Sequence, residues 1–281
     1  TRGELKKMLE KKALLLRKDV IRMIGEAGSG HPGRSLSAAD IVAALYFHHM
    51  RHRPEDPDWP DRDRFVLSKG HACPVLYAAL AEAGYFDRST LWTLRKFSSI
   101  LQGHPDMRKV PGVEVSAGSL GQGFPAANGM ALAGKIDGRS YNVYVLIGDG
   151  ECQEGVIWEA GMLSSQYKLD NLVAILDYNG LQLGGFLSEI MEIQPLSQKW
   201  QAFGWQVLEI DGHNILQIVD ALKEADQVRG KPTIIVAHTI KGKGVSFMEN
   251  KPKWHGVAPN KEEMERALRE LEEEESKLDV G

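Results

Sequence analysis

The chain has 281 residues, of which 43% are hydrophobic and 26% are charged, as expected for one large globular domain or two small ones. Its formal net charge of −4 gives no reason to expect nucleic-acid binding. No apolar run is long enough to span a membrane, residues 1–12 lack the apolar core of a signal peptide, and Cys73 and Cys152 form no CxxC pair. We therefore expect a cytoplasmic protein that binds neither nucleic acid nor membranes.

The apolar pattern predicts helices and strands that alternate along the chain. Residues 5–27 have helical periodicity and end at Gly28-Ser29-Gly30. His31-Pro32-Gly33 is expected to be a rigid loop before a helix that Ser37 could cap. Further helices are expected over 75–83, 126–133, 154–168, 194–203, 215–228 and 260–280, and strands over 65–67, 141–147, 172–176, 206–210 and 232–238. The last helix is acidic and is expected to be a solvated surface element. The alternation predicts an α/β fold, a doubly wound parallel sheet with helices on both faces, in a single domain over residues 1–281.

Polar residues follow two neighbouring strands of the predicted sheet. The run 141–147 ends in Gly148-Asp149-Gly150, and the run 172–176 leads through Asp177 and Tyr178 to Asn179. The carboxyl ends of parallel strands share one edge, where ligands bind. Carboxylate and amide oxygens suit Mg²⁺ or Ca²⁺, and Gly150 lets the backbone approach a phosphate. These residues predict a diphosphate docked through a divalent metal. The alternative is an ordinary turn between core elements, with Asn179 in a left-handed position.

The spacing of Asp149 and Asn179 resembles the thiamine diphosphate signature, and the chain more closely resembles the N-terminal half of a transketolase. The stretches that carry the resemblance occur in the family's order: Gly30-His31-Pro32-Gly33, Leu67-Ser68-Lys69-Gly70-His71, Gly103-His104-Pro105, residues 111–123, residues 148–155 and Trp254-His255-Gly256. They cover nearly the whole chain.

The resemblance implies roles for individual residues. Asp149, Asn179 and the main-chain carbonyl of Leu181 would hold the metal. Cofactor contacts would come from His71, Gly118, Ser119, Leu120, Gly150, Glu154, Asn179, Lys241 and His255. His31, His104 and His255 would surround the sugar substrate as catalytic residues. Glu154 matches a family carboxylate that links two active sites across a subunit interface, whereas its alternative role is a carboxylate favoured by a helix N-terminus. For Lys241 the alternative is a solvated lysine in a flexible loop.

The function implied by the resemblance is the transfer of a two-carbon ketol unit from a ketose phosphate to an aldose phosphate, as in the pentose phosphate pathway. In the family, a second domain that binds the cofactor's pyrimidine ring follows this one, and the chain stops at Gly281 before it. We therefore expect the N-terminal subunit of a split transketolase, which works with a C-terminal partner subunit in a two-plus-two heterotetramer. An excised fragment of a longer enzyme is the alternative.

Other functions remain to be weighed. A sulfosugar transketolase and a deoxyxylulose phosphate synthase use the same cofactor, and the segments around His104 and 115–120 argue against the latter. A non-catalytic regulatory homologue is a third possibility, which the presence of Asp149, Asn179 and the loop histidines argues against. Two positions depart from the family pattern: Tyr178 replaces a second asparagine or aspartate, and Arg34 follows Gly33 where relatives vary.

Overall fold

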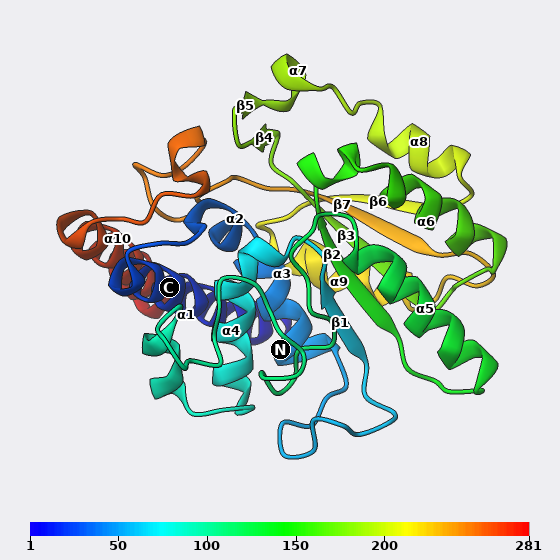
Figure 1. The fold of residues 1–281 in the computed structure, drawn as a ribbon, viewed down its shortest axis with the longest axis horizontal. Helices are drawn as coiled ribbons and strands as arrows, with labels where there is room; N and C mark the ends of the chain where they lie inside the picture. The colour runs from blue at the N-terminus through cyan, green and yellow to red at the C-terminus, as the bar shows by residue number, and fades with distance from the viewer. Residues whose placement is uncertain (281) are drawn as a thin grey trace.

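Five parallel strands form the central sheet, in the order β1-β2-β3-β7-β6 (Figure 1). Their bounds are Arg64–Leu67 for β1, Val143–Gly148 for β2, Leu172–Tyr178 for β3, Gln206–Asp211 for β6 and Thr233–His238 for β7. A separate antiparallel hairpin pairs β4, Leu181–Gln182, with β5, Gly185–Phe186. The computed structural model describes residues 1–280, so Gly281, the last residue of the predicted domain, lies outside the described residues.

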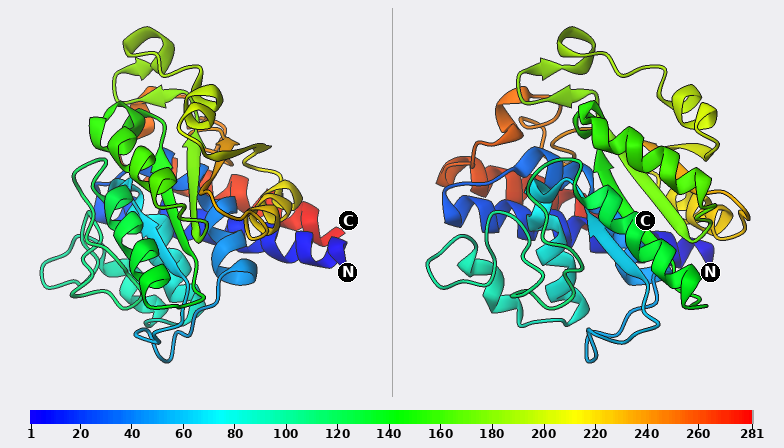
Figure 2. Two further views of the ribbon diagram at one scale, coloured as in Figure 1. Left: turned by 90° about the vertical axis from the view of Figure 1, so that its right-hand side faces the viewer. Right: turned by 45° about the vertical axis from the view of Figure 1, so that its right-hand side comes forward.

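Helices cover both faces of the sheet (Figures 1 and 2). The helices on one face are α1 (Arg2–Ala27), α3 (Ala39–Ala44), α4 (Cys73–Ala83), α9 (Ile215–Ala225) and α10 (Lys261–Val280). Those on the other face are α5 (Gly123–Ile136), α6 (Gly155–Gln166) and α8 (Leu196–Ala202). The short helices α2 (Pro32–Ser37) and α7 (Leu187–Ile190) and the single turns Leu45–His49, Gly70–Ala72, Arg88–Thr93, Gly150–Gln153 and Pro252–His255 complete the helical structure. Within residues 1–280, no helix is both long and apolar enough to cross a membrane.

The strands are apolar on both sides because each side packs into its own core. In β2, Tyr144 and Leu146 belong to the core under α1 and α4, whereas Val143, Val145 and Ile147 belong to the core under α5 and α6. Successive strand residues point to opposite faces, so a strand that is covered twice reads as a continuous apolar run. The predicted α/β class, a doubly wound parallel sheet, is confirmed.

Two local predictions were wrong. Pro32 and Gly33 lie in helix α2 rather than in a rigid loop, because proline has no N–H to lose and its φ is already helical at a first position. The helix expected after Ser37 is present as α3, but its N-cap is Ala38 and Ser37 does not cap it. Helix α10 is not simply a solvated element: Ala267 and Leu271 are fully buried, and α10 lies along α1 (Figure 2). An apolar stripe at helical spacing hidden among the glutamates accounts for this packing.

Candidate active site

The carboxylate of Asp149, directly after β2, ties together the ends of two strands. It accepts hydrogen bonds from the backbone N–H groups of Gly150 (2.7 Å), Asn179 (2.9 Å) and Gly180 (2.7 Å). Gly180 has a φ of +73°, a conformation that glycine adopts without strain. Asp149 is fully buried, so these bonds hold its carboxylate in one orientation.

Oxygen atoms from two of the predicted metal ligands face a single cationic group. The guanidinium of Arg34 places Nη1 3.1 Å from Oδ1 of Asp149 and donates from Nη2 to the carbonyl oxygen of Leu181 at 2.7 Å. The side chain of Asn179 accepts a hydrogen bond from the N–H of Leu181 at 3.2 Å, while its Nδ2 is buried without a partner. Carboxylate, amide and carbonyl groups are the donor set of a hard cation, so these residues fit Mg²⁺ or Ca²⁺.

The expected ligand set differs from the common clusters of acidic and imidazole ligands. Among residues 1–280, no group of three or more His, Cys, Asp or Glu side chains could hold a metal ion. A metal at this edge of the sheet would depend on one carboxylate together with amide and main-chain oxygens. Such a site leaves room for phosphate oxygens in the coordination shell.

A cavity of about 580 Å³ opens beside this cation position. Eight of the residues expected at the site line it: His31, His71, His104, Gly118, Leu120, Gly150, Glu154 and His255. Arg34 and Lys69 add positive charge to the lining, whereas Leu183 and Ile190 give the rim an apolar part. A cavity with cationic and apolar walls suits a ligand that carries both a diphosphate and aromatic rings.

Three histidines of the cavity contact one another although they come from distant parts of the chain. The ring centroid of His31 lies 5.2 Å from that of His71 and 5.5 Å from that of His255, and the His71 and His255 rings stack at 5.6 Å. Burial, with nearby cations such as Arg95 for His31 and Lys241 for His255, lowers their pKa values to about 4 and about 3. Burial also lowers the pKa of His71. All three rings are therefore neutral at pH 7, and each can donate and accept a proton.

Lys241, which follows β7, is fully buried rather than solvated. Its Nζ lies 3.1 Å from Nδ1 of His255, and the N–H of Gly242 donates to the carbonyl of Gly33. Burial, followed by the charge of Arg34, lowers the pKa of Lys241 to about 7. Lys241 thus joins the loop after β7 to the two histidine-bearing loops.

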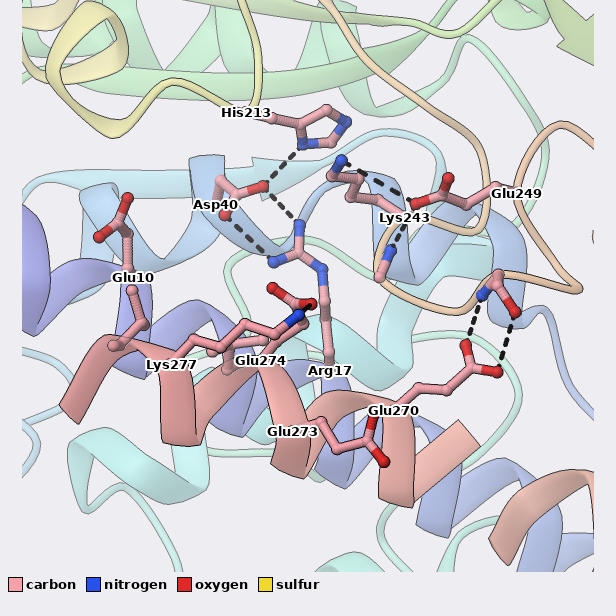
Figure 3. Close-up of a pocket in the computed structure, with 14 residues that line it drawn as sticks. Glu10, Arg17, Asp40, His213, Lys243, Glu249, Glu270, Glu273, Glu274 and Lys277 are labelled. Atoms are coloured by element: carbon pink, nitrogen blue, oxygen red, sulfur yellow. Dashed lines mark hydrogen bonds and ion pairs between the residues drawn. The ribbon is translucent and has the colours of Figure 1, made fainter. Parts of the chain in front are cut away.

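A larger cavity of about 640 Å³ lies elsewhere and contains none of the residues expected at the site (Figure 3). Glutamates of α10 line much of it, and the buried chain Arg17–Asp40–His213 forms one wall. Its volume alone does not make it the functional site, because the strand ends with their cation-binding oxygens open into the smaller cavity.

Comparison with known proteins decides the family. The profile described as "Transketolase, thiamine diphosphate binding domain" matches residues 9–278. The chain belongs to the transketolase family. The predicted membership of the transketolase family is confirmed, and so is the expectation of a transferase, because the relatives are named as transketolases and transketolase subunits.

Two similar relatives have almost the same length as this chain. The 6-deoxy-6-sulfo-D-fructose transketolase subunit SqwG of Clostridium sp. (strain MSTE9) is 48% identical over 266 residues, which cover 95% of this chain and 97% of that protein. An apulose-4-phosphate transketolase subunit of Phocaeicola vulgatus is 46% identical over 263 residues, which cover 94% of this chain and 93% of that protein. Both relatives are named as subunits of transketolases.

Other transketolases that match this chain are longer. The transketolase of Leishmania mexicana superposes with a TM-score of 0.87 at 32% identity, over 97% of this chain but only 45% of that one. Human transketolase is 46% identical over 91% of this chain and 41% of its own length. The chain therefore spans less than half of these full-length transketolases.

The transketolase fold brings most of the expected residues to one edge of the sheet. Gly118 and Ser119 are exposed, and Glu154 is an exposed residue just before α6 with no side-chain capping bond. Ser119, Asn179 and Lys241 are absent from the cavity wall, although Asn179 contacts Asp149 beside the wall and Lys241 contacts His255 in the wall. Both interpretations of Glu154 remain compatible with its position.

Sequence reasoning missed a buried layer of charged residues beneath the site. Lys69 and Asp177 are fully buried and form an ion pair, and Lys69 also donates to the carbonyl of Arg34 at 2.9 Å. Burial opposes ionisation of Asp177, but Lys69 outweighs it and the pKa falls to about 2. The sequence held one indication of this layer. A charged residue follows each of two apolar runs, in Ser68-Lys69-Gly70 and in Leu176-Asp177-Tyr178.

Proposed function

We propose that this chain is the diphosphate-binding subunit of a two-chain transketolase that transfers a two-carbon ketol unit from a ketose phosphate to an aldose phosphate. The observation that carries the proposal is the convergence of the Asp149 carboxylate and the Leu181 carbonyl on one cation position, beside a cavity lined by four histidines. When bound, thiamine diphosphate supplies the electron sink for breaking the carbon–carbon bond next to the ketose carbonyl.

The residues of this chain would anchor the cofactor's diphosphate. Asp149, Asn179 and the Leu181 carbonyl would hold Mg²⁺ or Ca²⁺, which binds the phosphate oxygens in turn. The backbone of Gly150 would contact the diphosphate, as would His71, while Gly118, Ser119, Leu120 and Lys241 would complete the cofactor contacts. Asp149 and Asn179 directly follow β2 and β3, and this attachment to the sheet supports a rigid anchor.

The neutral histidines would transfer protons to and from the substrate. His31 and His255 lie with their rings 5.5 Å apart in the cavity wall, and His104 lies in the same wall. Since each ring is uncharged at neutral pH, it can take a proton from a sugar hydroxyl or return one to an oxygen without prior deprotonation. We assign these three residues the catalytic roles.

Exposed apolar side chains near the site support the proposal that this chain binds partner chains. Leu183 and Ile190, which line the cavity, are 71% and 45% exposed, and Phe186 and Met191 are exposed beside them. Met162 and Leu163 form a second exposed apolar pair on α6. Contiguous apolar surface of this kind marks protein interfaces. We infer that the first group meets a C-terminal subunit with the pyrimidine-binding domain, and that the second supports a two-plus-two assembly.

The donor sugar has three candidates. Relatives named for apulose-4-phosphate and for 6-deoxy-6-sulfo-D-fructose are similar to this chain to almost the same degree. We therefore propose a ketose with an anionic terminal group as donor, with a pentose phosphate pathway sugar, apulose 4-phosphate and a sulfosugar as the three alternatives. Transfer rates from fructose 6-phosphate, apulose 4-phosphate and 6-deoxy-6-sulfofructose, measured on the reconstituted complex, would separate them.

The compartment is proposed on chemical grounds. Cys73 and Cys152 are buried and form no disulfide within the described part of the chain. Unpaired thiols suit a reducing compartment, and we assign the enzyme to the cytoplasm.

The cofactor site is tested with Asp149→Ala. Titration calorimetry with thiamine diphosphate, in excess Mg²⁺ and then in excess EDTA, should show metal-dependent binding in the wild-type chain and none in the variant. Asp58→Ala, which changes an exposed carboxylate, is the control. Equal metal-dependent affinity in Asp149→Ala and the wild-type chain would remove the basis of the proposal.

The two-chain requirement is tested by reconstitution. The purified chain should show little ketol transfer from fructose 6-phosphate, apulose 4-phosphate or 6-deoxy-6-sulfofructose to an aldose phosphate until a C-terminal transketolase subunit is added. Full activity of the isolated chain would contradict the need for a partner.

A further inference from the structure

Arg34 is the residue of the site that neither the proposed metal ligands nor the proposed substrate contacts account for. It is 3% exposed and lies in α2. Its two terminal nitrogens contact Asp149 Oδ1 at 3.1 Å and the Leu181 carbonyl oxygen at 2.7 Å. These are two of the three groups that we propose as metal ligands.

Neighbouring glycines give the guanidinium its space. A Cβ atom on Gly148 would lie 2.8 Å from Nη1 of Arg34, and one on Gly150 would lie 3.3 Å from Nη2. The glycines on either side of Asp149 thus form a cradle that the guanidinium fills. A side chain at Gly148 could not coexist with Arg34 in this position.

A divalent ion and this guanidinium cannot share the position. An ion bound to Oδ1 of Asp149 and to the Leu181 oxygen would take the contacts that Arg34 makes, and it would lie within a few ångströms of a fixed positive charge. At that distance the two positive charges repel each other strongly, because the effective dielectric constant inside the protein is well below that of water. The ion can bind only after the guanidinium leaves.

We infer that Arg34 is a resident cation that competes with the divalent metal for Asp149 and Leu181, and so sets the affinity of this chain for the metal. The inference rests on the metal site of the proposed function. The apparent affinity for the metal is the intrinsic affinity multiplied by the fraction of molecules in which the guanidinium has left the position. A shorter or neutral residue at position 34 would raise that fraction.

The cavity offers the guanidinium a second position once it has left the metal ligands. Arg34 lines the cavity, whose other cationic residue in the wall is Lys69, and its Nε is buried without a hydrogen-bond partner. A diphosphate in the cavity would offer oxygens to the displaced side chain, since guanidinium binds phosphate in a bidentate manner. Arg34 would then pass from the metal ligands to the cofactor's phosphates.

The test measures the binding of Mn²⁺, without cofactor, to the isolated chain. Electron paramagnetic resonance monitors the free Mn²⁺ in the titration. Arg34→Ala should bind Mn²⁺ about tenfold more tightly than the wild-type chain, since a competing ion pair of about 1.4 kcal/mol is removed. Arg34→Gln, which keeps a hydrogen-bond donor but no charge, should fall between them and serves as the second variant if Arg34→Ala does not fold. The thermal midpoint without metal should be lower in Arg34→Ala, and Mn²⁺ should raise it by more than in the wild-type chain.

Two controls separate this inference from the metal site itself. Arg62→Ala removes another ion pair, with Nη2 of Arg62 2.7 Å from Glu114, and should leave Mn²⁺ affinity unchanged. Asp149→Asn should abolish Mn²⁺ binding. Equal or weaker Mn²⁺ affinity in Arg34→Ala, with binding lost in Asp149→Asn, would overturn the role of Arg34 and leave the metal site standing. Wild-type affinity in Asp149→Asn would overturn the metal site and the inference with it.

Discussion

The buried carboxylate of Glu151 accepts a hydrogen bond of 2.8 Å from the backbone N–H of Gly121. It also accepts from the N–H of Gly148 at 3.0 Å and from the hydroxyl of Ser68. One side chain therefore joins the turns after β1 and β2 to the loop that begins α5. All three segments contribute to the cavity, so Glu151 fixes their relative positions.

We predict that Glu151→Gln weakens both the fold and the cofactor site. The amide NH₂ group would face one of the N–H or O–H donors that now meet a carboxylate oxygen, and an unmatched buried donor costs about 1–3 kcal/mol. Urea unfolding should show a loss of that size, and Mg²⁺-dependent binding of thiamine diphosphate should weaken. Glu159→Gln, an exposed change on α6, is the matched control and should alter neither quantity. An unchanged unfolding free energy in Glu151→Gln would show that the three turns hold their positions without this residue.

The sheet and the position of the site could be predicted from the sequence because both depend on local patterns. Apolar runs ending in Gly148-Asp149-Gly150 and Asn179 define strands and their ends without knowledge of the rest of the chain. The contact of Arg34 with Asp149 could not be predicted, since it depends on how α2 packs against the sheet edge. The buried face of α10 was hidden for a related reason: its glutamates dominate the composition, while only a narrow stripe meets α1.

Acid sensitivity should arise from a buried chain of charges beside the larger cavity. Arg17 forms an ion pair with Asp40, whose Oδ2 lies 2.7 Å from Nδ1 of His213 (Figure 3). The Nε2 atom of His213 accepts a hydrogen bond from the N–H of Ile240, next to Lys241. Burial opposes ionisation of Asp40, but Arg17 and His213 outweigh it and lower the pKa of Asp40 to about 2.

The sign of the pH effect follows from that shift. An unfolded aspartate has a pKa of about 3.9, so the unfolded chain takes up the proton first on acidification. The stabilisation is present above about pH 4 and is lost as the pH falls through the folded pKa near 2.

We expect Asp40→Asn to lose about 3 kcal/mol of stability at pH 7, because Arg17 is left buried without its counter-ion. Its unfolding free energy should then fall less steeply than that of the wild-type chain between pH 4 and pH 2, as measured by urea titrations. The exposed Asp58→Asn should keep the wild-type profile, and a steep acid loss in Asp40→Asn would assign the effect to other carboxylates.

Close contact between two segments that we propose to bind the cofactor gives the last prediction. A Cβ atom on Gly70 would lie 2.7 Å from the carbonyl oxygen of Ala117, whereas one on Gly155 would meet nothing within 4 Å. Gly70→Ala must therefore push the turn that carries His71 away from the loop that carries Gly118, at a cost of about 1–3 kcal/mol. Gly155→Ala, in the first turn of α6, should not destabilise the protein, because alanine is the better helix former. Urea unfolding and thiamine diphosphate titration of both variants check this: Gly70→Ala should lose stability and cofactor affinity together, and Gly155→Ala neither. Full cofactor affinity in Gly70→Ala would mean that the spacing of these two segments does not matter for cofactor binding.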